Sequence, residues 1–205
     1  MKVAVSFIKS NYNEKETIDI INQTSSDYLH VDIMDGIFTK NKNYDFEDIE
    51  LFLKDNHKPL DIHLMCASPK EYIEDYIKLK PERISFHIEA VSNPEKLIDY
   101  LHDNNIKCGL AINPDTNITK IKPYLNKIDL VLVMSVYPGK GGQKFIMETI
   151  TKINELSALK GNFEIEVDGG VNNEVIHLLK KVDTVVSGSY ICESIDFEER
   201  INKLK

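Results

Sequence analysis

The sequence predicts an α/β protein folded as a closed (β/α)8 barrel, and three observations support this prediction. Short apolar runs rich in β-branched residues alternate along the whole chain with longer stretches of 3.6-residue periodicity. Eight such units in 205 residues leave roughly 26 residues for each, the compact end of what such a barrel needs. Glycine-rich turns follow the last three apolar runs, where barrels of this kind commonly bind phosphate.

The expected elements follow one another in a regular order. We expect strands over residues 3–8, 28–33, 60–65, 83–88, 107–112, 130–136, 163–167 and 184–186. We expect helices over residues 15–24, 46–56, 69–79, 94–104, 118–125, 145–159, 173–180 and 197–205. Ser68 before Pro69 and Asn93 before Pro94 are typical of helix N-termini. Because no linker composition interrupts the series, we expect a single domain over residues 1–205.

A doubly wound open sheet would show the same alternation of strands and helices. That fold commonly places G-x-G-x-x-G after its first strand. Here the first apolar run is followed by SNYN at residues 10–13, and the glycine-rich turns come late in the chain. The position of the glycines therefore favours the barrel.

Composition and charge exclude several classes of partner. The chain carries 25 Lys and Arg against 33 Asp and Glu, a net charge of −8, with no run of basic residues. Nucleic acid is therefore not expected as a partner, and 42% hydrophobic residues in short runs predict no membrane span. A single phosphate on a small substrate could still be held by backbone N–H groups. Three isolated cysteines and a short N-terminal apolar run predict a cytoplasmic protein without disulfides.

Ionisable side chains gather at the carboxyl ends of the expected strands. His30 and Asp32 share one face of their strand because they are two residues apart, and Asp61 and His63 repeat this on the next strand. Asp168 ends the seventh strand. Two imidazoles and two carboxylates, from His30, Asp32, His63 and Asp168, suit one Zn²⁺, Fe²⁺, Mn²⁺ or Co²⁺ ion. The alternative is a hydrogen-bonded network at the barrel rim.

The glycine-rich turns form a second group of candidate residues. They cover residues 138–143, 168–170 and 187–189, and each follows an expected strand. Successive backbone N–H groups in such turns can bind a phosphate, although helix packing also requires small residues. Met34, Met65 and Met134 lie near strand ends and could line a substrate site or fill the core. His87 and Glu89 could be further ligands or could support them.

Nine segments together closely resemble the ribulose-phosphate 3-epimerase family. They are residues 5–8 (VSFI), 29–36 (LHVDIMDG), 63–65 (HLM), 87–90 (HIEA), 113–116 (NPDT), 133–139 (VMSVYPG), 141–145 (GGQKF), 166–170 (EVDGG) and 186–189 (VSGS). The resemblance implies a TIM barrel of the ribulose-phosphate-binding type. It implies a homo-oligomer that interconverts D-ribulose 5-phosphate and D-xylulose 5-phosphate with one divalent metal cation.

The resemblance also implies roles for individual residues. His30, Asp32, His63 and Asp168 would bind the metal, with Asp32 as proton acceptor and Asp168 as proton donor. Contacts to the substrate would come from Ser6, His63, Gly139, Lys140, Gly141, Gly142, Asp168, Gly169, Gly170, Gly188 and Ser189. Met34, Met65 and Met134 would line the space beside the reacting carbon. Inversion at C3 needs two acid/base groups on opposite sides of a planar enediolate, which two strands across a barrel mouth can supply.

Two departures from the family pattern lie in loops over the substrate. Residues 37–41 read IFTKN where the family usually has HFVPN, and Lys140 replaces a usual aromatic residue. These changes put the sugar specificity in question, and residues 37–45 are the expected source of any specificity of this chain's own. One alternative function is therefore a 3-epimerase for a hexulose phosphate such as D-allulose 6-phosphate.

Two further alternatives keep the barrel and change the chemistry. A decarboxylase of related barrels would have Asp-x-Lys-x-x-Asp on a strand, but Met34 stands where that lysine would be. A non-catalytic barrel that binds a sugar phosphate would have lost an acid/base group or a metal ligand. All four ionisable residues are present, which argues against that alternative.

Overall fold

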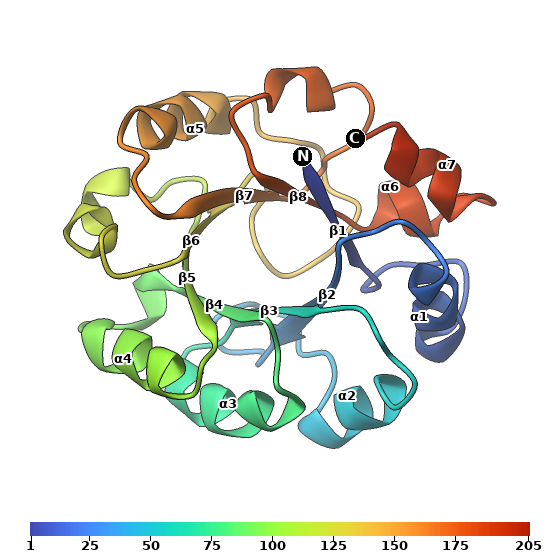
Figure 1. Ribbon diagram of the computed structural model, residues 1–205, viewed down its shortest axis with the longest axis horizontal. Coiled ribbons are helices and arrows are strands. Elements are labelled where there is room, and N and C mark those ends of the chain that lie inside the picture. Colours follow the sequence, from blue (N-terminus) through green and yellow to red (C-terminus); the bar gives the residue numbers. More distant parts are fainter.

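The computed structural model describes residues 1–205 and arranges eight parallel strands in one closed barrel (Figure 1). Each strand pairs with its neighbours in chain order, and the last strand closes the ring against the first. The strands are β1 (Lys2–Ser6), β2 (Tyr28–Met34), β3 (Leu60–Met65), β4 (Arg83–His87), β5 (Lys107–Ile112), β6 (Leu130–Met134), β7 (Glu164–Asp168) and β8 (Thr184–Ser187). The predicted TIM barrel is confirmed, and a closed ring excludes the open doubly wound sheet.

Helices surround the ring of strands (Figure 1). The α-helices are α1 (Glu14–Asn22), α2 (Phe46–Phe52), α3 (Pro69–Tyr76), α4 (Glu95–Asp103), α5 (Thr149–Ala158), α6 (Ser189–Cys192) and α7 (Phe197–Asn202). Short 3₁₀ turns are η1 (Ile77–Leu79), η2 (Ile88–Ala90), η3 (Ile118–Lys120), η4 (Lys122–Tyr124) and η5 (Ile176–Leu178). In α4 the side chains of Leu97, Ile98 and Leu101 are buried, as the 3.6-residue period of the sequence predicts.

Three expected helices differ from those observed. Residues 118–125 form only the turns η3 and η4, since Pro123 lacks the N–H that a continuous α-helix needs there. Residues 173–180 form only η5, although the Asn172 side chain accepts hydrogen bonds from the Glu174 and Val175 N–H groups as a helix N-cap does. The helix expected from residue 145 begins at Thr149, because the Ile146 N–H bonds to the Ser135 carbonyl beside β6.

The strands separate an apolar layer from a polar barrel interior. Along β2 the side chains alternate, so that Val31 and Ile33 belong to the continuous apolar core that packs against the helices. His30 and Asp32, which alternate with them in sequence, point into the barrel and are also buried. The barrel interior is thus filled partly by charged side chains, which need partners there.

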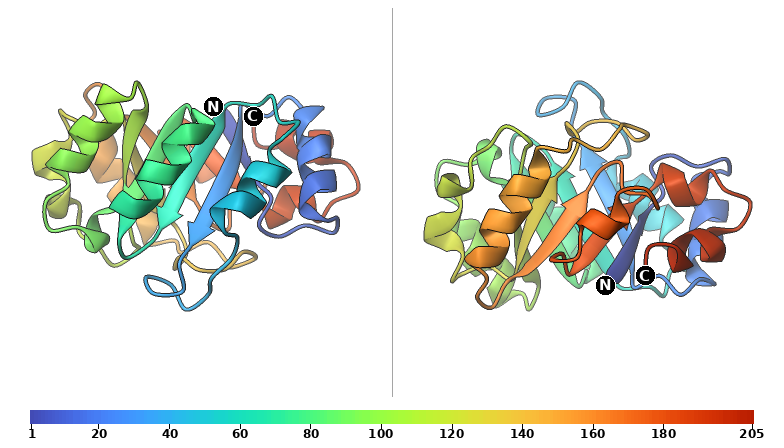
Figure 2. Two further views of the ribbon diagram at one scale, coloured as in Figure 1. Left: turned by 90° about the horizontal axis from the view of Figure 1, so that it is seen from below. Right: turned by 90° about the horizontal axis from the view of Figure 1, so that it is seen from above.

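The loops after β2 and β6 project beyond the strands at the same end of the barrel, whereas both chain termini lie at the opposite end (Figure 2). The end with the two projecting loops is where the strands reach their carboxyl termini. Catalytic residues collect at this end in barrels of this type.

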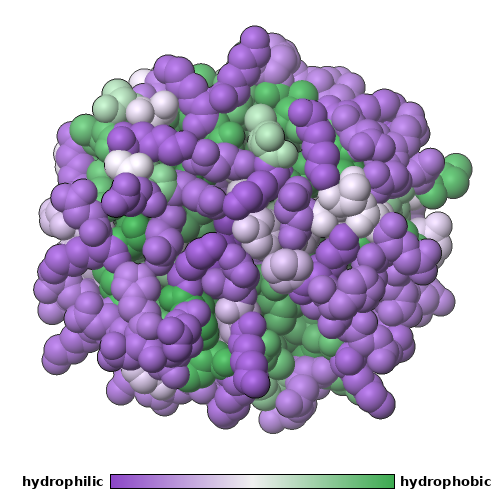
Figure 3. Space-filling model, viewed as in Figure 1, coloured by the Kyte–Doolittle hydropathy of each residue, from purple (hydrophilic) through white to green (hydrophobic).

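The remaining surface has few distinguishing features. Hydrophilic side chains cover most of the face drawn in Figure 3, and apolar side chains lie between them in small separate groups. None of the helices has the length and apolar character needed to cross a membrane. The three cysteines are buried, and none forms a disulfide.

Candidate active site

Strand register brings the ionisable residues together at the carboxyl end of the barrel. Asp32 on β2 pairs with His63 on β3, and Ser6 on β1 pairs with His30. Asp168 ends β7 on the other side of the ring. One ligand atom from each of His30, Asp32, His63 and Asp168 lies within 4.8 Å of the others. The four residues picked out from strand spacing therefore form one cluster.

The His30 imidazole is oriented by Asp61 through Nδ1, and its other ring nitrogen, Nε2, has no hydrogen bond. Nδ1 lies 2.7 Å from Asp61 Oδ2, so Nδ1–H donates to that carboxylate. Nε2 is buried without a hydrogen-bond partner, and Asp32 Oδ1 stands 3.4 Å away. A buried, unpaired imidazole nitrogen beside carboxylate oxygens is the arrangement that a metal ligand needs. The residues present thus fit one divalent cation.

His63 is held in a comparable way by a chain of side chains. Its Nδ1 lies 3.1 Å from Asp32 Oδ1 and 3.7 Å from Asp168 Oδ2. Its Nε2 lies 2.9 Å from His87 Nε2, and His87 Nδ1 lies 3.1 Å from Glu89 Oε2. His87 and Glu89 therefore support His63 from the side away from the cluster, which decides between the two roles considered for them.

A buried ionic network that the sequence analysis did not identify lies beneath the cluster. The Arg83 guanidinium, only 1% exposed, donates a hydrogen bond to Asp61 and forms ion pairs with both Asp61 and Glu166. His30, Asp61 and Glu166 also bring ligand atoms close together, but Arg83 already neutralises that group. Arg83 shares its inward phase with Ser85 and His87 on β4, and this spacing was the signal available in the sequence.

The two carboxylates that face each other across the cluster differ in acidity. Burial raises the pKa of Asp168 to about 7, and the nearby charge of Asp32 adds to the increase. Burial acts on Asp32 in the same direction, but the positive charge of His30 beside it and a hydrogen bond with His63 outweigh it. The pKa of Asp32 is therefore held below its usual value. Ser6 Oγ also donates to Asp32 Oδ2 at 2.7 Å. Without a bound metal, and below about pH 7, this arrangement favours one carboxylate and one carboxylic acid.

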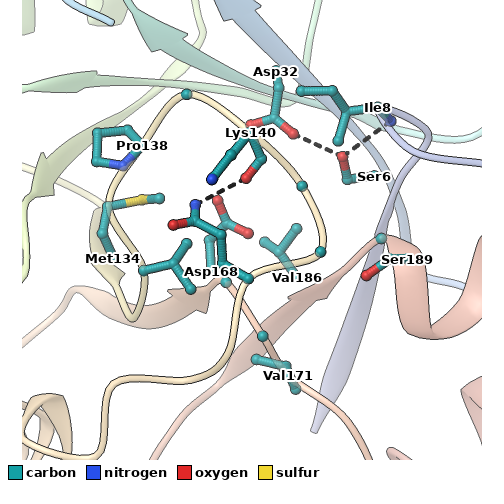
Figure 4. Close-up of a pocket in the computed structure, with 18 of the residues that line it drawn as sticks. Ser6, Ile8, Asp32, Met134, Pro138, Lys140, Asp168, Val171, Val186 and Ser189 are labelled. Carbon is teal, nitrogen blue, oxygen red and sulfur yellow. Dashed lines mark hydrogen bonds between the residues drawn. The ribbon is translucent and has the colours of Figure 1, made fainter.

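A cavity of about 260 Å³ opens directly above the cluster (Figure 4). Asp32, Met65 and Met134 line it. So do the expected substrate residues Ser6, Gly139, Lys140, Gly141, Gly142, Asp168, Gly169, Gly170, Gly188 and Ser189. His30 and His63 are fully buried beneath it. Met34 is the exception: it lines a separate surface cavity with Tyr44. Residues not expected from the sequence, such as Asn172, Tyr190 and Glu193, also line the site.

Glycine is required at two of these positions by backbone packing. Gly169 has φ +115°, and a Cβ there would lie 2.3 Å from Val136 Cγ2. Gly170 has φ +65°, and a Cβ there would lie 2.5 Å from the Phe145 nitrogen. The turn after β7 thus packs tightly against the loop after β6. Both explanations considered for the glycines, close packing and an open backbone facing a ligand, apply to this turn.

The loop after β2 is held by hydrogen bonds both to β2 itself and to the loop after β6. The Asn43 side chain accepts a bond from the Met34 N–H at 2.8 Å and donates to the Asp32 carbonyl at 2.7 Å. Further out, Asn41 Nδ2 donates to the Gly139 carbonyl at 2.7 Å, which links this loop to the loop after β6. The atypical segment is therefore anchored to the loop after β6, which lines the cavity.

Comparison with known proteins agrees with these features. The model of the Ribulose-phosphate 3 epimerase family matches residues 2–192. The ribulose-phosphate 3-epimerase of Helicobacter pylori J99 is 37% identical over 211 residues, covering 100% of this chain and 97% of the relative. That of Bacillus subtilis is 32% identical over 216 residues, covering 100% and 98%. A chloroplastic ribulose-5-phosphate-3-epimerase of Arabidopsis thaliana is 32% identical, covering 99% and 75%.

Solved structures share the fold at low sequence identity. KGPDC from Streptococcus mutans superposes with a TM-score of 0.75 at 14% identity, covering 99% of this chain and 94% of the other. The 3-hexulose-6-phosphate synthase of Salmonella typhimurium gives a TM-score of 0.71 at 15% identity, covering 100% and 96%. At such identities the likeness concerns the barrel alone.

Proposed function

Because the chain belongs to the ribulose-phosphate 3-epimerase family, we propose that it interconverts D-ribulose 5-phosphate and D-xylulose 5-phosphate by inverting C3. One observation supports this most directly. Asp32 on β2 and Asp168 on β7 come from opposite parts of the ring and face the same small cavity. Removal and return of a proton at one carbon requires such a pair.

One divalent cation is part of the proposal. Its ligands would be His30, Asp32, His63 and Asp168, and Zn²⁺, Fe²⁺, Mn²⁺ and Co²⁺ all suit two imidazoles and two carboxylates. When bound, the cation would act as a Lewis acid toward the C2 ketone. The unpaired Nε2 of His30 supports this assignment, because a buried nitrogen without a partner is otherwise costly.

The proton transfers would be divided between the two carboxylates. Asp32, kept ionised by His30 and His63, would remove the C3 proton and leave an enediolate. Asp168 would return a proton to the opposite face. In the reverse direction the two residues would exchange roles. Ser6 would fix the orientation of Asp32 through its hydrogen bond.

The rest of the cavity would hold the sugar phosphate. Backbone N–H groups of the glycine turns at residues 139–142, 169–170 and 188–189 would bind the phosphate, with the Lys140 ammonium nearby. Met65 and Met134 would pack beside the reacting carbon. Met34 is not included, since it lines a different cavity.

The test combines metal analysis with turnover of purified protein. We expect about one divalent cation per chain, loss of activity on chelation, and conversion of ribulose 5-phosphate to xylulose 5-phosphate. Asp32→Asn and Asp168→Asn should each lower kcat by about 10³-fold, the usual contribution of an acid/base group. Glu164→Gln, at the opposite end of the same strand as Asp168, is the control and should stay within about twofold of wild type.

Allulose 6-phosphate should be assayed in parallel. A large preference in kcat/KM for the hexulose phosphate would contradict the proposed substrate, and full activity of both Asn variants would contradict the proposed roles.

A further inference from the structure

We propose that Lys9 and Glu193 form a charge pair that controls phosphate binding. Lys9 supplies positive charge to the substrate phosphate, and Glu193 competes for Lys9 while the phosphate is absent. The proposal rests on the proposed function in one respect, since it takes the glycine turns as the phosphate end of the cavity.

The position of Lys9 is set by the glycine loop after β6. Its side chain lies along residues 141 and 142: a Cβ added at Gly141 would meet Lys9 Cβ at 3.1 Å, and one added at Gly142 would meet Lys9 Nζ at 2.7 Å. The ammonium can lie there only because both residues lack side chains. The neighbouring residue Ile8 lines the cavity. Lys9 therefore places its charge at the wall of the proposed phosphate site.

Glu193 occupies the facing position. It lines the same cavity as Gly188 and Ser189 and follows α6 in the chain. Its Oε1 lies 2.9 Å from Lys9 Nζ, and this is the only ion pair that either side chain makes. The side chains are 48% and 41% exposed, so that water screens the attraction between them. Exchange of one anionic partner of Lys9 for another therefore costs little free energy.

The charge balance at this end of the cavity supports a change of partner. A phosphate monoester near neutral pH brings a charge of about −1.5 to −2 into a wall that already holds the Glu193 carboxylate. Lys140, the other lysine at this end, makes no ion pair in the structure and is exposed. Lys9 is thus the cation whose place is fixed beside the glycine backbone. A dianionic phosphate is the stronger partner for Lys9, because charged hydrogen bonds to phosphate are stronger than those to a solvent-screened surface carboxylate.

The two members of the pair are expected to act in opposite directions, and this separates the proposal from a purely structural salt bridge. With inorganic phosphate as the probe and metal-loaded protein, calorimetry should give a dissociation constant about tenfold higher for Lys9→Met. Glu193→Gln should give one about threefold lower than wild type. Lys9→Arg, which retains the charge, should stay near wild type.

The pair Lys107–Glu82 provides a matched control. It has a similar separation of 2.7 Å and similar exposure, but it joins residues at the start of β4 and β5, the far end of the barrel. Lys107→Met and Glu82→Gln should leave phosphate binding unchanged. If Lys9→Met and Glu193→Gln change the dissociation constant in the same direction, or leave it unchanged, the proposal is wrong. Absence of phosphate binding by the wild-type protein would also overturn it.

A double variant tests the competition itself. In the Lys9→Met background, Glu193→Gln should lower the phosphate dissociation constant much less than in wild type, because there is no ammonium left to release. An equal decrease in both backgrounds would show direct repulsion of phosphate by Glu193 and would overturn the competition.

Phosphate binding and epimerisation are measured separately, so the two proposals can fail independently. If the wild-type enzyme is active but Lys9→Met and Glu193→Gln change the phosphate dissociation constant in the same direction, only the role of the pair is contradicted. If the wild-type protein is inactive but the two variants change the phosphate dissociation constant in opposite directions, only the proposed function is contradicted.

Discussion

Arg83 is the residue on which the charge balance of the barrel interior depends. It lies between Asp61 and Glu166, which are themselves 1% and 0% exposed. Asp61 in turn fixes His30 through Nδ1. The pKa of Glu166 is raised by burial in spite of this arginine, which shows how costly an anion is at this depth. A carboxylate pair without the guanidinium would be strongly unfavourable.

Arg83→Met should therefore destabilise the protein by about 3–5 kcal/mol, the usual cost of removing one partner from a buried ionic network. Urea unfolding measures this directly. Arg200→Met changes the other arginine of the chain, which lies in α7 near the surface, and should cost about 1 kcal/mol or less. Equal effects of the two substitutions would contradict the role given to Arg83.

Asp168 gives the metal-free protein a distinct dependence on pH. Its pKa is raised from 3.8 to about 7, so between these values the folded state keeps a proton that the unfolded state releases. The stability from this group is present below about pH 4 and is lost as the pH rises toward 7. Asp168→Asn has no such proton. The free energy of unfolding of the variant minus that of wild type should hence increase by about 2 kcal/mol between pH 5 and pH 8.

Urea titrations at the two pH values measure that difference, and His87, whose pKa burial lowers to about 4, contributes equally to both proteins. A difference that does not change with pH would contradict the acidity assigned to Asp168.

At the scale of elements, the loop after β6 lines the site, and one side chain joins it to the loop after β2. Asn41 donates to the Gly139 carbonyl, while the neighbouring Phe38 ring packs on His87 with 4.6 Å between centroids. Asn41→Ala should cost about 1 kcal/mol of loop contact and raise KM for the phosphosugar about fivefold, with a smaller change in kcat. Steady-state kinetics checks this. Lys40→Ala, an exposed side chain in the same loop, serves as the control.

The elements also show what a single sequence can and cannot predict. Strand positions follow from short apolar runs, and the inward phase of His30 and Asp32 follows from the two-residue period of a strand. The segments 118–125 and 173–180 have helical periodicity, yet they form only 3₁₀ turns. In the first segment Pro123 removes a backbone N–H that a continuous α-helix would use. The apolar pattern alone does not reveal such an interruption.

For the whole molecule, the closed ring brings together residues whose proximity cannot be deduced from spacing along the chain. Lys9 and Glu193 are separated by nearly the whole sequence, and they meet because β8 pairs with β1. Arg83 and Glu166 meet across the barrel interior for the same reason. The net charge of −8 is compatible with an anionic substrate, because the site presents glycine backbone and a few placed cations.

The assembly state remains a prediction of the family resemblance. We expect sedimentation equilibrium to give a mass that is an integral multiple, greater than one, of the chain mass. A monomer at micromolar concentration would contradict this expectation.

The central claim is that two carboxylates act on opposite faces of one carbon, and turnover of ribulose 5-phosphate in D₂O tests it most directly. Asp168 is 15% exposed in its side chain, so it can exchange its proton with solvent between turnovers. We predict that xylulose 5-phosphate formed by the wild-type enzyme carries one deuterium at C3, delivered by Asp168. Product that retains the original C3 hydrogen would show transfer by a single group and would contradict the account.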